Sequence, residues 1–259
     1  MAERKVCVVT GSSSGIGAAT ARRYAREGWN VVVNFSRDAV PAEAVANECR
    51  ALGAEALVVQ ADVASDADCR RLGREVDAQF GRCDALVNNA GTTKFVALKD
   101  LDGLQAEDFH RIYDVNVIGP YQMTRALLPL IQRHPDRHPA AGVVNISSIA
   151  SMMGRGSSIA YMASKGALNA MTIGLARALG PLVRVNAIAP GLVETPWLQQ
   201  GLGAERYAAR VQDYKALSAL EAVISPDDVA DAAWWLGACA AKTTGELLLL
   251  DAGLRISRA

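Results

Sequence analysis

Short apolar runs rich in β-branched residues alternate along the chain with stretches whose apolar residues follow the period of a helix. This alternation predicts repeated strand–helix–strand units. The runs are continuously apolar, which is typical of parallel strands whose two faces are both covered by helices. The predicted strands are residues 5–10, 30–36, 56–61, 85–88, 143–147, 183–189 and 246–251.

Helix-capping residues agree with these boundaries. Ser65 followed by Asp68 resembles a capping pair, and Ser225 precedes a proline at the first helical position. Gly28 and Gly53 stand where a glycine commonly ends a helix. No repeat or linker interrupts the pattern, so we expect residues 1–259 to form a single domain.

A glycine-rich segment follows the first predicted strand and leads directly into a helix. It reads TGSSSGIG at residues 10–17. Its glycines permit a tight turn and a close approach of the backbone to a pyrophosphate, whose charge a helix N-terminus favours. An ordinary strand-to-helix turn has a similar composition, but the position after the first strand favours a nucleotide site.

Two architectures fit the alternation, an eight-fold barrel and an open doubly wound sheet. Seven predicted strands and the glycine-rich loop favour the second. We therefore predict an α/β fold, a Rossmann-type doubly wound seven-stranded parallel sheet with helices on both faces.

Composition and charge exclude several classes of partner. The 259 residues carry 27 Lys and Arg against 27 Asp and Glu, a balance that argues against a general nucleic-acid binder. No run has the length of a membrane helix, and the first apolar run is too short for a signal peptide. We therefore expect a cytoplasmic protein with no nucleic-acid or membrane partner.

Cysteine and histidine spacing indicates neither disulfides nor a metal site. The five cysteines, at positions 7, 49, 69, 83 and 239, include no CxxC pair and are expected to be reduced thiols in the core. His110, His134 and His138 lack metal-ligand spacing, and the last two lie in a proline-rich stretch expected to be a surface connection. We predict that no metal is bound.

Tyr161 and Lys165 stand four residues apart in a helical stretch, so both side chains lie on one face. A nearby ammonium favours a phenolate and is expected to lower the phenol pKa, which suits acid–base catalysis. A solvated helix face with a tyrosine at the core edge has the same pattern. Ser148, at the end of the fifth strand, is placed to donate to a substrate carbonyl or to serve as a turn residue.

Together, in chain order, these segments resemble the short-chain dehydrogenase/reductase family. The segments that carry the resemblance are TGSSSGIG at 10–17, NNAG at 88–91, Ser148 thirteen residues before Tyr161, YMASK at 161–165, and Pro190-Gly191 with Thr195. The match runs from about residue 5 to residue 253 and is most similar to the branch that includes 3-oxoacyl-carrier-protein reductases and many sugar, alcohol and steroid dehydrogenases. Taken alone, NNAG also suits a simple turn.

The resemblance implies an NAD(P)-dependent oxidoreductase that interconverts a carbonyl and a secondary alcohol by direct hydride transfer, without a metal. It makes Tyr161 the general acid or base and gives Lys165 two roles, lowering the tyrosine pKa and binding the nicotinamide ribose. Ser148 would position the substrate oxygen, and Asn116 would hold a water in the proton relay.

The resemblance also implies where the cofactor binds. The glycine-rich loop would hold the pyrophosphate, and the ends of the third, fourth and sixth strands would hold the adenine, its ribose and the carboxamide. Besides Tyr161 and Lys165, the expected cofactor residues are Gly11, Ser13, Ser14, Gly15, Ile16, Gly17, Ser36, Arg37, Asp62, Val63, Asn89, Ala90, Gly91, Pro190, Gly191, Val193 and Thr195.

The choice between NADP(H) and NAD(H) is expected to depend on the end of the second strand. Relatives that prefer NAD usually carry an acid at the position of Phe35, whereas here Ser36 and Arg37 follow and suit a 2′-phosphate. Ser14 stands where many NADP-preferring relatives place a base, and Asp38 is close enough to replace the missing acid. We expect NADP(H) to be favoured, with NAD(H) as the alternative.

Residues 194–221 are expected, by resemblance, to form a substrate-binding lid. Five residues of this segment either form an apolar wall around the substrate or are ordinary packing residues. They are Trp197, Leu198, Leu202, Tyr207 and Tyr214. Met152, Met153 and Arg155 are further candidates, with Arg155 either meeting an anionic substrate or simply solvated.

The leading hypothesis is a carbonyl reductase or alcohol dehydrogenase acting on a small molecule. The alternative is a non-catalytic dinucleotide-binding sensor or scaffold, which would be expected to lack the tyrosine–lysine pair. A sugar-nucleotide epimerase or dehydratase is disfavoured because no second substrate domain follows. By analogy, helices at about 105–134 and 158–179 and the last strand predict a homotetramer, with a homodimer as the alternative.

Overall fold

The computed structural model describes residues 4–134 and 139–256. Their strands form one parallel sheet in the order β3-β2-β1-β4-β5-β6-β7. The strands are β1 (Val6–Val9), β2 (Asn30–Phe35), β3 (Ala56–Gln60), β4 (Ala85–Asn88), β5 (Ala141–Ile146), β6 (Val183–Pro190) and β7 (Leu247–Leu250). The predicted α/β fold is confirmed. Residues 135–138 of the proline-rich stretch, including His138, lie outside the described residues.

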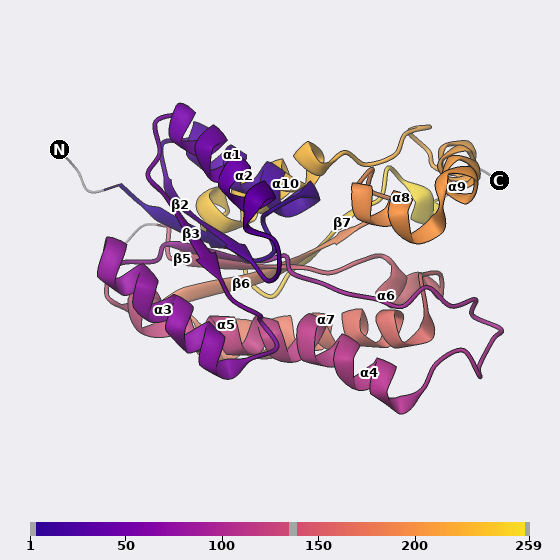
Figure 1. Cartoon of the computed structure of the whole chain (residues 1–259), viewed down its shortest axis with the longest axis horizontal. Coiled ribbons are helices and arrows are strands. Elements are labelled where there is room, and N and C mark those ends of the chain that lie inside the picture. The colour runs from indigo at the N-terminus through magenta and orange to yellow at the C-terminus, as the bar shows by residue number, and fades with distance from the viewer. Residues whose placement is uncertain (1–3, 135–138, 257–259) are drawn as a thin grey trace.

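Helices cover both faces of the sheet (Figure 1). One face carries α1 (Gly15–Arg26), α2 (Ala39–Ala51) and α10 (Pro226–Trp234), and the other carries α3 (Asp66–Phe80), α5 (Gly119–Gln132) and α7 (Ile159–Leu179). The remaining helical segments are α4 (Ala106–Tyr113), η1 (Asp114–Ile118), α6 (Ala150–Met153), α8 (Pro196–Leu202), α9 (Ala204–Leu217), η2 (Trp235–Cys239) and η3 (Leu254–Ile256).

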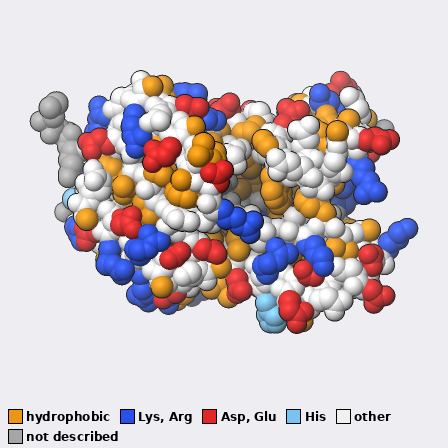
Figure 2. All heavy atoms as spheres, in the orientation of Figure 1, with side chains coloured by type: hydrophobic (Ala, Val, Ile, Leu, Met, Phe, Trp, Pro, Cys, Tyr) orange, Lys and Arg blue, Asp and Glu red, His pale blue; other side chains and the backbone are white. Residues whose placement is uncertain are grey.

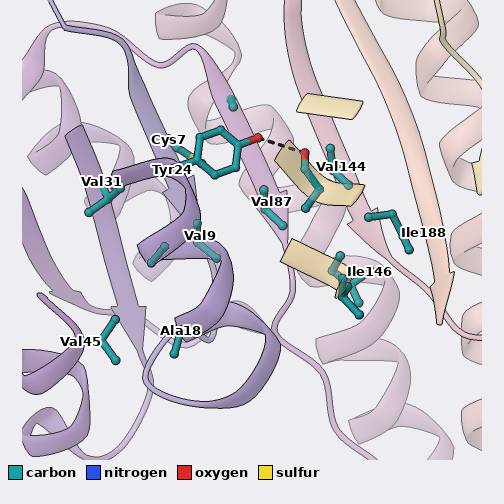
Figure 3. Close-up of a cluster of buried hydrophobic side chains, with 14 of the residues drawn as sticks. Cys7, Val9, Ala18, Tyr24, Val31, Val45, Val87, Val144, Ile146 and Ile188 are labelled. Carbon is teal, nitrogen blue, oxygen red and sulfur yellow. Dashed lines mark hydrogen bonds between the residues drawn. The ribbon is translucent and has the colours of Figure 1, made fainter. Parts of the chain in front are cut away.

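The continuously apolar strands supply two separate hydrophobic clusters. In β1, Cys7 and Val9 pack on the α1 side and Val6 and Val8 on the α5 side, because successive side chains point to opposite faces. Figure 3 shows Tyr24 of α1 among the first cluster, with its hydroxyl donating to the Ala233 carbonyl at 3.2 Å. Burial on both faces explains why these strands contain so few polar residues.

The predicted helix caps are present. The Ser65 hydroxyl accepts from the Asp68 amide, and Ser225 forms a capping box with Asp228. These caps satisfy amides that the first turn of a helix leaves without an intrahelical partner. The helix boundaries read from the sequence are therefore supported at the level of single hydrogen bonds.

The prediction for the cysteines is correct at four positions and wrong at one. Cys7, Cys49, Cys69 and Cys83 are buried and free, but Cys239 is exposed because it lies at the end of η2, past the packed face of α10. Among the described residues, no cluster of side chains is suited to a metal ion. Within the same residues, no helix is both long and apolar enough to span a bilayer.

The order of the strands positions the candidate site. The chain crosses from β3 at one edge to β4 beside β1, so the segments that follow β1 and β4 leave the sheet next to each other at its carboxyl edge. Ligands of doubly wound sheets bind at this reversal of strand order. The glycine-rich loop and the segment at 88–91 meet there.

Candidate active site

The glycine-rich loop and the end of β4 pack so closely that no side chain would fit at Gly11 or Gly17. A methyl group at Gly17 would lie 2.5 Å from Nδ2 of Asn89 and 2.5 Å from the Gly11 carbonyl oxygen. Asn89 Nδ2 donates to the carbonyls of Thr10 and Gly11, each at 2.9 Å. Gly11 itself has a φ of 59°, in the region that favours glycine. The loop is thus a rigid backbone cradle at the start of α1.

The cradle suits a pyrophosphate because it opens onto a helix N-terminus. Ser14 is the N-cap of α1, but its exposed side chain makes no capping hydrogen bond to the helix. The amides of a helix's first turn and its dipole favour an anion at this position. Ser13 and Ile16 are partly buried, and Ile16 packs on the core below.

Asn34, which the motifs did not identify, holds the cradle from below. Its side chain accepts from the Gly11 amide at 3.0 Å and donates to the carbonyls of Val59 and Ala61 at 3.2 and 3.0 Å. It is 1% exposed. The sequence signal is a second asparagine in β2, after Asn30 and directly following three valines.

The end of β2 has no carboxylate at the position expected for an acid, and an arginine follows two residues later. Phe35 occupies that position and is buried in the core, whereas Ser36 and Arg37 are exposed. Asp38 is used as the N-cap of α2, where its side chain accepts from the Val40 amide at 3.0 Å. The nearest acid is therefore committed to a helix cap.

The expected adenine-side residues lie just after β3. Asp62 is exposed, and its Oδ1 accepts from the Ala64 amide at 3.0 Å. Val63 is buried against α5, where a methyl group at Gly119 would lie 2.8 Å from its Cγ2. The Val63 side chain therefore packs between the segment after β3 and α5. Because Val63 follows β3, its backbone lies near the carboxyl edge of the sheet.

Tyr161 and Lys165 lie one turn apart on α7, as the spacing predicted. Ser158 caps the helix by accepting from the Tyr161 amide at 3.2 Å. Lys165 Nζ is 5.6 Å from the centre of the Tyr161 ring and donates to the Ile146 carbonyl at 2.8 Å. The Ser148 hydroxyl lies close enough to the Tyr161 phenol to lower its pKa. The structure thus brings Ser148, Tyr161 and Lys165 together at the end of β5.

The expected lowering of the tyrosine pKa is wrong for this structure. Burial raises the pKa of Tyr161 to about 12, and the nearby Ser148 hydroxyl opposes that rise only in part. Burial also lowers the pKa of Lys165 to about 8, because the charged ammonium loses its hydration. The spacing of the pair revealed their proximity, but it gave no information on how deeply the two groups are buried.

Asn116 lies in the π-helical segment η1 and fixes the loop after β4. Its Oδ1 accepts from the Thr92 amide at 2.8 Å, and its Nδ2 donates to the Thr92 carbonyl at 2.9 Å and to Ser164 Oγ at 3.0 Å. A methyl group at Gly91 would lie 3.5 Å from Asn116 Oδ1 and 3.7 Å from Lys165 Nζ. The Asn116 side chain is therefore occupied in joining this loop to the helix of Tyr161.

The segment after β6 closes the site from the opposite side. Thr195 caps α8, and a methyl group at Gly15 would lie 3.4 Å from Thr195 Cγ2. Pro190 ends β6, Gly191 donates its amide to the Leu250 carbonyl at 2.8 Å, and Val193 is buried beside Ile224. The predicted segment therefore reaches the glycine-rich cradle.

The candidate substrate residues divide into two groups. Tyr214 is a packing residue, because it is buried and its hydroxyl donates to the Asp251 carbonyl at 2.7 Å. Trp197, by contrast, lies beside Tyr161, with ring centroids 6.5 Å apart. Leu198, Leu202 and Tyr207 are partly buried.

The three candidates between Ser148 and Tyr161 are also placed differently from one another. Met153 packs against the core, whereas Met152 and Arg155 are exposed. Figure 2 shows the surface hollowed, with hydrophobic side chains inside, between the part of the molecule that carries α1 and the part that carries α8 and α9.

The chain is similar to known proteins along nearly its whole length. The family model for short chain dehydrogenases matches residues 5–206. The chain is 43% identical, over 98% of its length and 97% of the relative's, to granaticin polyketide synthase putative ketoacyl reductase 2 of Streptomyces violaceoruber. It is 34% identical, over 96% of each chain, to a 3-oxoacyl-[acyl-carrier-protein] reductase of Synechocystis sp. (strain PCC 6803). A putative short-chain dehydrogenase/reductase from Burkholderia xenovorans superposes with a TM-score of 0.90 at 42% identity, covering 99% of this chain and 100% of that one.

Proposed function

The chain belongs to the short-chain dehydrogenase/reductase family, and we propose on that premise that it interconverts a small-molecule ketone and the matching secondary alcohol. Family membership makes it an oxidoreductase and implies that it binds NAD(P)H. The observation that carries the proposal is the meeting of Ser148, Tyr161 and Lys165 at the carboxyl edge of the sheet, beside the glycine cradle.

Each group in this cluster has a proposed task. A nicotinamide cofactor bound at the cradle would supply or accept the hydride. Ser148 donates to the substrate oxygen, while Tyr161 protonates that oxygen during reduction and removes its proton during oxidation. A phenol whose pKa is about 12 stays protonated near neutral pH, so Tyr161 carries the proton that carbonyl reduction consumes.

Lys165 and Asn116 are proposed to support this chemistry. The Lys165 ammonium favours the phenolate when Tyr161 gives up its proton, and it also binds the nicotinamide ribose. Asn116 holds the loop that borders both groups through its side chain, and the relay role that the family resemblance implies stays a prediction. The cofactor cradle uses backbone groups of the loop at 11–17 and of the segments that follow β3, β4 and β6.

The direct test uses purified protein with NADPH or NADH and a panel of ketones and secondary alcohols, followed by the absorbance of reduced nicotinamide. We expect reduction of at least one class of ketone, with higher kcat/KM for NADPH. Dinucleotide binding with no turnover of any ketone or alcohol would overturn the proposal in favour of a non-catalytic sensor or scaffold.

We propose that Arg37 makes NADP(H) the favoured cofactor, since Phe35 is buried at the acid position and Asp38 caps a helix. Arg37→Ala is expected to raise the KM for NADPH at least about tenfold, because a hydrogen bond to a charged phosphate contributes roughly 1.5–3 kcal/mol. The KM for NADH should change less than about twofold.

The matched control is Arg26→Ala, which removes an exposed arginine from the far end of α1. It should leave both KM values unchanged. A wild-type preference for NADH, or equal changes of both KM values in Arg37→Ala, would contradict the assignment.

We further propose that residues 1–259 act as one domain in which residues 194–221 form a lid, and that the chain associates as a homotetramer or homodimer. Exposed apolar side chains on the α5 and α7 side, Ile118, Tyr121 and Ile173, support association there. Light scattering of the purified protein measures the assembly, and a monomer would contradict it. Hydrogen exchange tests the lid, which should become protected when cofactor binds.

A further inference from the structure

Two aromatic rings from separate elements lie next to the proposed acid–base tyrosine. Trp197, the second residue of α8, has its ring centroid 6.5 Å from that of Tyr161, with the ring planes tilted by 44°. Phe95, from the segment after β4, lies 5.7 Å from Trp197 at a tilt of 51°. We call Phe95 and Trp197 the aromatic shelf.

Main-chain and hydroxyl contacts hold Phe95 in a fixed relation to Tyr161. The Val96 amide donates to the Ser157 carbonyl at 2.8 Å, and the Thr93 and Ser157 hydroxyls lie 2.7 Å apart. Ser157 immediately precedes the N-cap of α7, the helix that carries Tyr161. The segment with Phe95 is therefore joined to the start of the catalytic helix.

Gly201 lets α8 rest directly on the Phe95 ring. A methyl group at Gly201 would lie 2.0 Å from Phe95 Cε2, so another residue there would displace the helix or the ring. Trp197 lies four residues earlier on the same helix and therefore on the same face. The contact at Gly201 thus places the indole beside Tyr161.

The indole keeps ring surface free for a ligand. Both of its ring contacts are tilted rather than stacked, and 45% of the Trp197 surface is exposed. Offset stacking on an aromatic face adds to the attraction that comes from burying apolar area alone. An indole at this distance from Tyr161 borders the space where a substituent of the reacting carbonyl must lie.

We propose that the aromatic shelf selects ketones whose carbonyl is attached to a flat, unsaturated ring, with Trp197 as the residue that determines this specificity. The inference rests on the proposed carbonyl–alcohol chemistry and names the substrate class for the same site. A saturated ring of equal size buries similar area but presents no π face, so it gains less from Trp197.

The test compares 1-tetralone with trans-1-decalone, which share a bicyclic carbon skeleton and differ in the unsaturated ring. The measured quantity is the ratio of kcat/KM for 1-tetralone to that for trans-1-decalone. Trp197→Leu, which keeps apolar bulk without a ring, is expected to lower this ratio about tenfold, equivalent to about 1.4 kcal/mol. Trp197→Phe should restore most of it.

Trp235→Leu is the matched control, because Trp235 lies on η2 and is 46% exposed, against 45% for Trp197. It should leave the ratio unchanged. If both ketones are reduced and the ratio of their kcat/KM values is the same in wild type and Trp197→Leu, the proposed role of Trp197 in specificity is wrong, while the proposed chemistry stands.

The affinity for 1-tetralone, measured by calorimetry, tests the specificity proposal independently of the proposed reaction. Binding that weakens in Trp197→Leu but not in Trp235→Leu supports the shelf even if no ketone is reduced, in which case only the proposed reaction fails. Binding that is equal in all three proteins overturns the shelf.

Discussion

Replacement of Tyr161 by phenylalanine is expected to lower kcat for ketone reduction by about a thousandfold, because general acid–base groups contribute roughly 10²–10⁴ in rate. The substitution removes only the hydroxyl, which lies near Ser148, and leaves the ring beside Trp197. Cofactor binding should therefore persist within about twofold. Steady-state kinetics and the quenching of protein fluorescence by NADPH measure the two quantities separately.

Tyr24→Phe is the matched control for the loss of a tyrosine hydroxyl. Tyr24 is fully buried in the core and donates to the Ala233 carbonyl at 3.2 Å (Figure 3). Its replacement should reduce the free energy of unfolding by about 1 kcal/mol and leave kcat unchanged. Turnover by Tyr161→Phe equal to that of wild type would refute the proposed acid–base role.

The sheet was predictable because burial on both faces imposes an apolar residue at nearly every position of a strand. The runs at 5–10 and 30–36 contain β1 and β2, and the glycine-rich loop distinguished the open sheet from a barrel. The start of β5 was placed too late, since Ala141 and Gly142 have little β propensity and are strand residues only through their pairing with Val183 and Arg184.

The site was predictable where its residues carry a local pattern, and less so where they act through distant contacts. The spacing of Tyr161 and Lys165 is visible in the sequence, as are the cradle glycines. Asn34, which accepts from the Gly11 amide, lies 23 residues after Gly11 in the sequence. Phe95 and Trp197 are separated by about a hundred residues of chain. No local spacing in the sequence therefore reveals either contact. The same limit applies to the pKa of Tyr161, which burial controls.

Lys165→Met is expected to lower kcat for alcohol oxidation about a hundredfold at pH values below about 8, where Lys165 carries its proton, and to lower it less above that pH. The Lys165 ammonium lies 5.6 Å from the centre of the Tyr161 ring. At an effective dielectric constant of about 20, two charges at such a distance interact by about 3 kcal/mol. Below about pH 8 the loss of this cation makes the phenolate harder to form, so oxidation slows, whereas above that pH the neutral amine gives the phenolate no such support.

Reduction should respond differently, which separates this role of Lys165 from a general loss of structure. Reduction uses the neutral phenol, and a pKa of about 12 keeps Tyr161 protonated, so the profile of kcat for reduction should stay flat between about pH 6 and 8 in both proteins. Lys242→Met removes an exposed lysine near the start of β7 and should shift neither profile. An oxidation profile of Lys165→Met that superimposes on that of wild type would show that the ammonium does not act on the phenol. In that event Lys165 would serve only to bind the cofactor, and its loss would raise the KM for NADP(H) without moving the pH dependence of kcat.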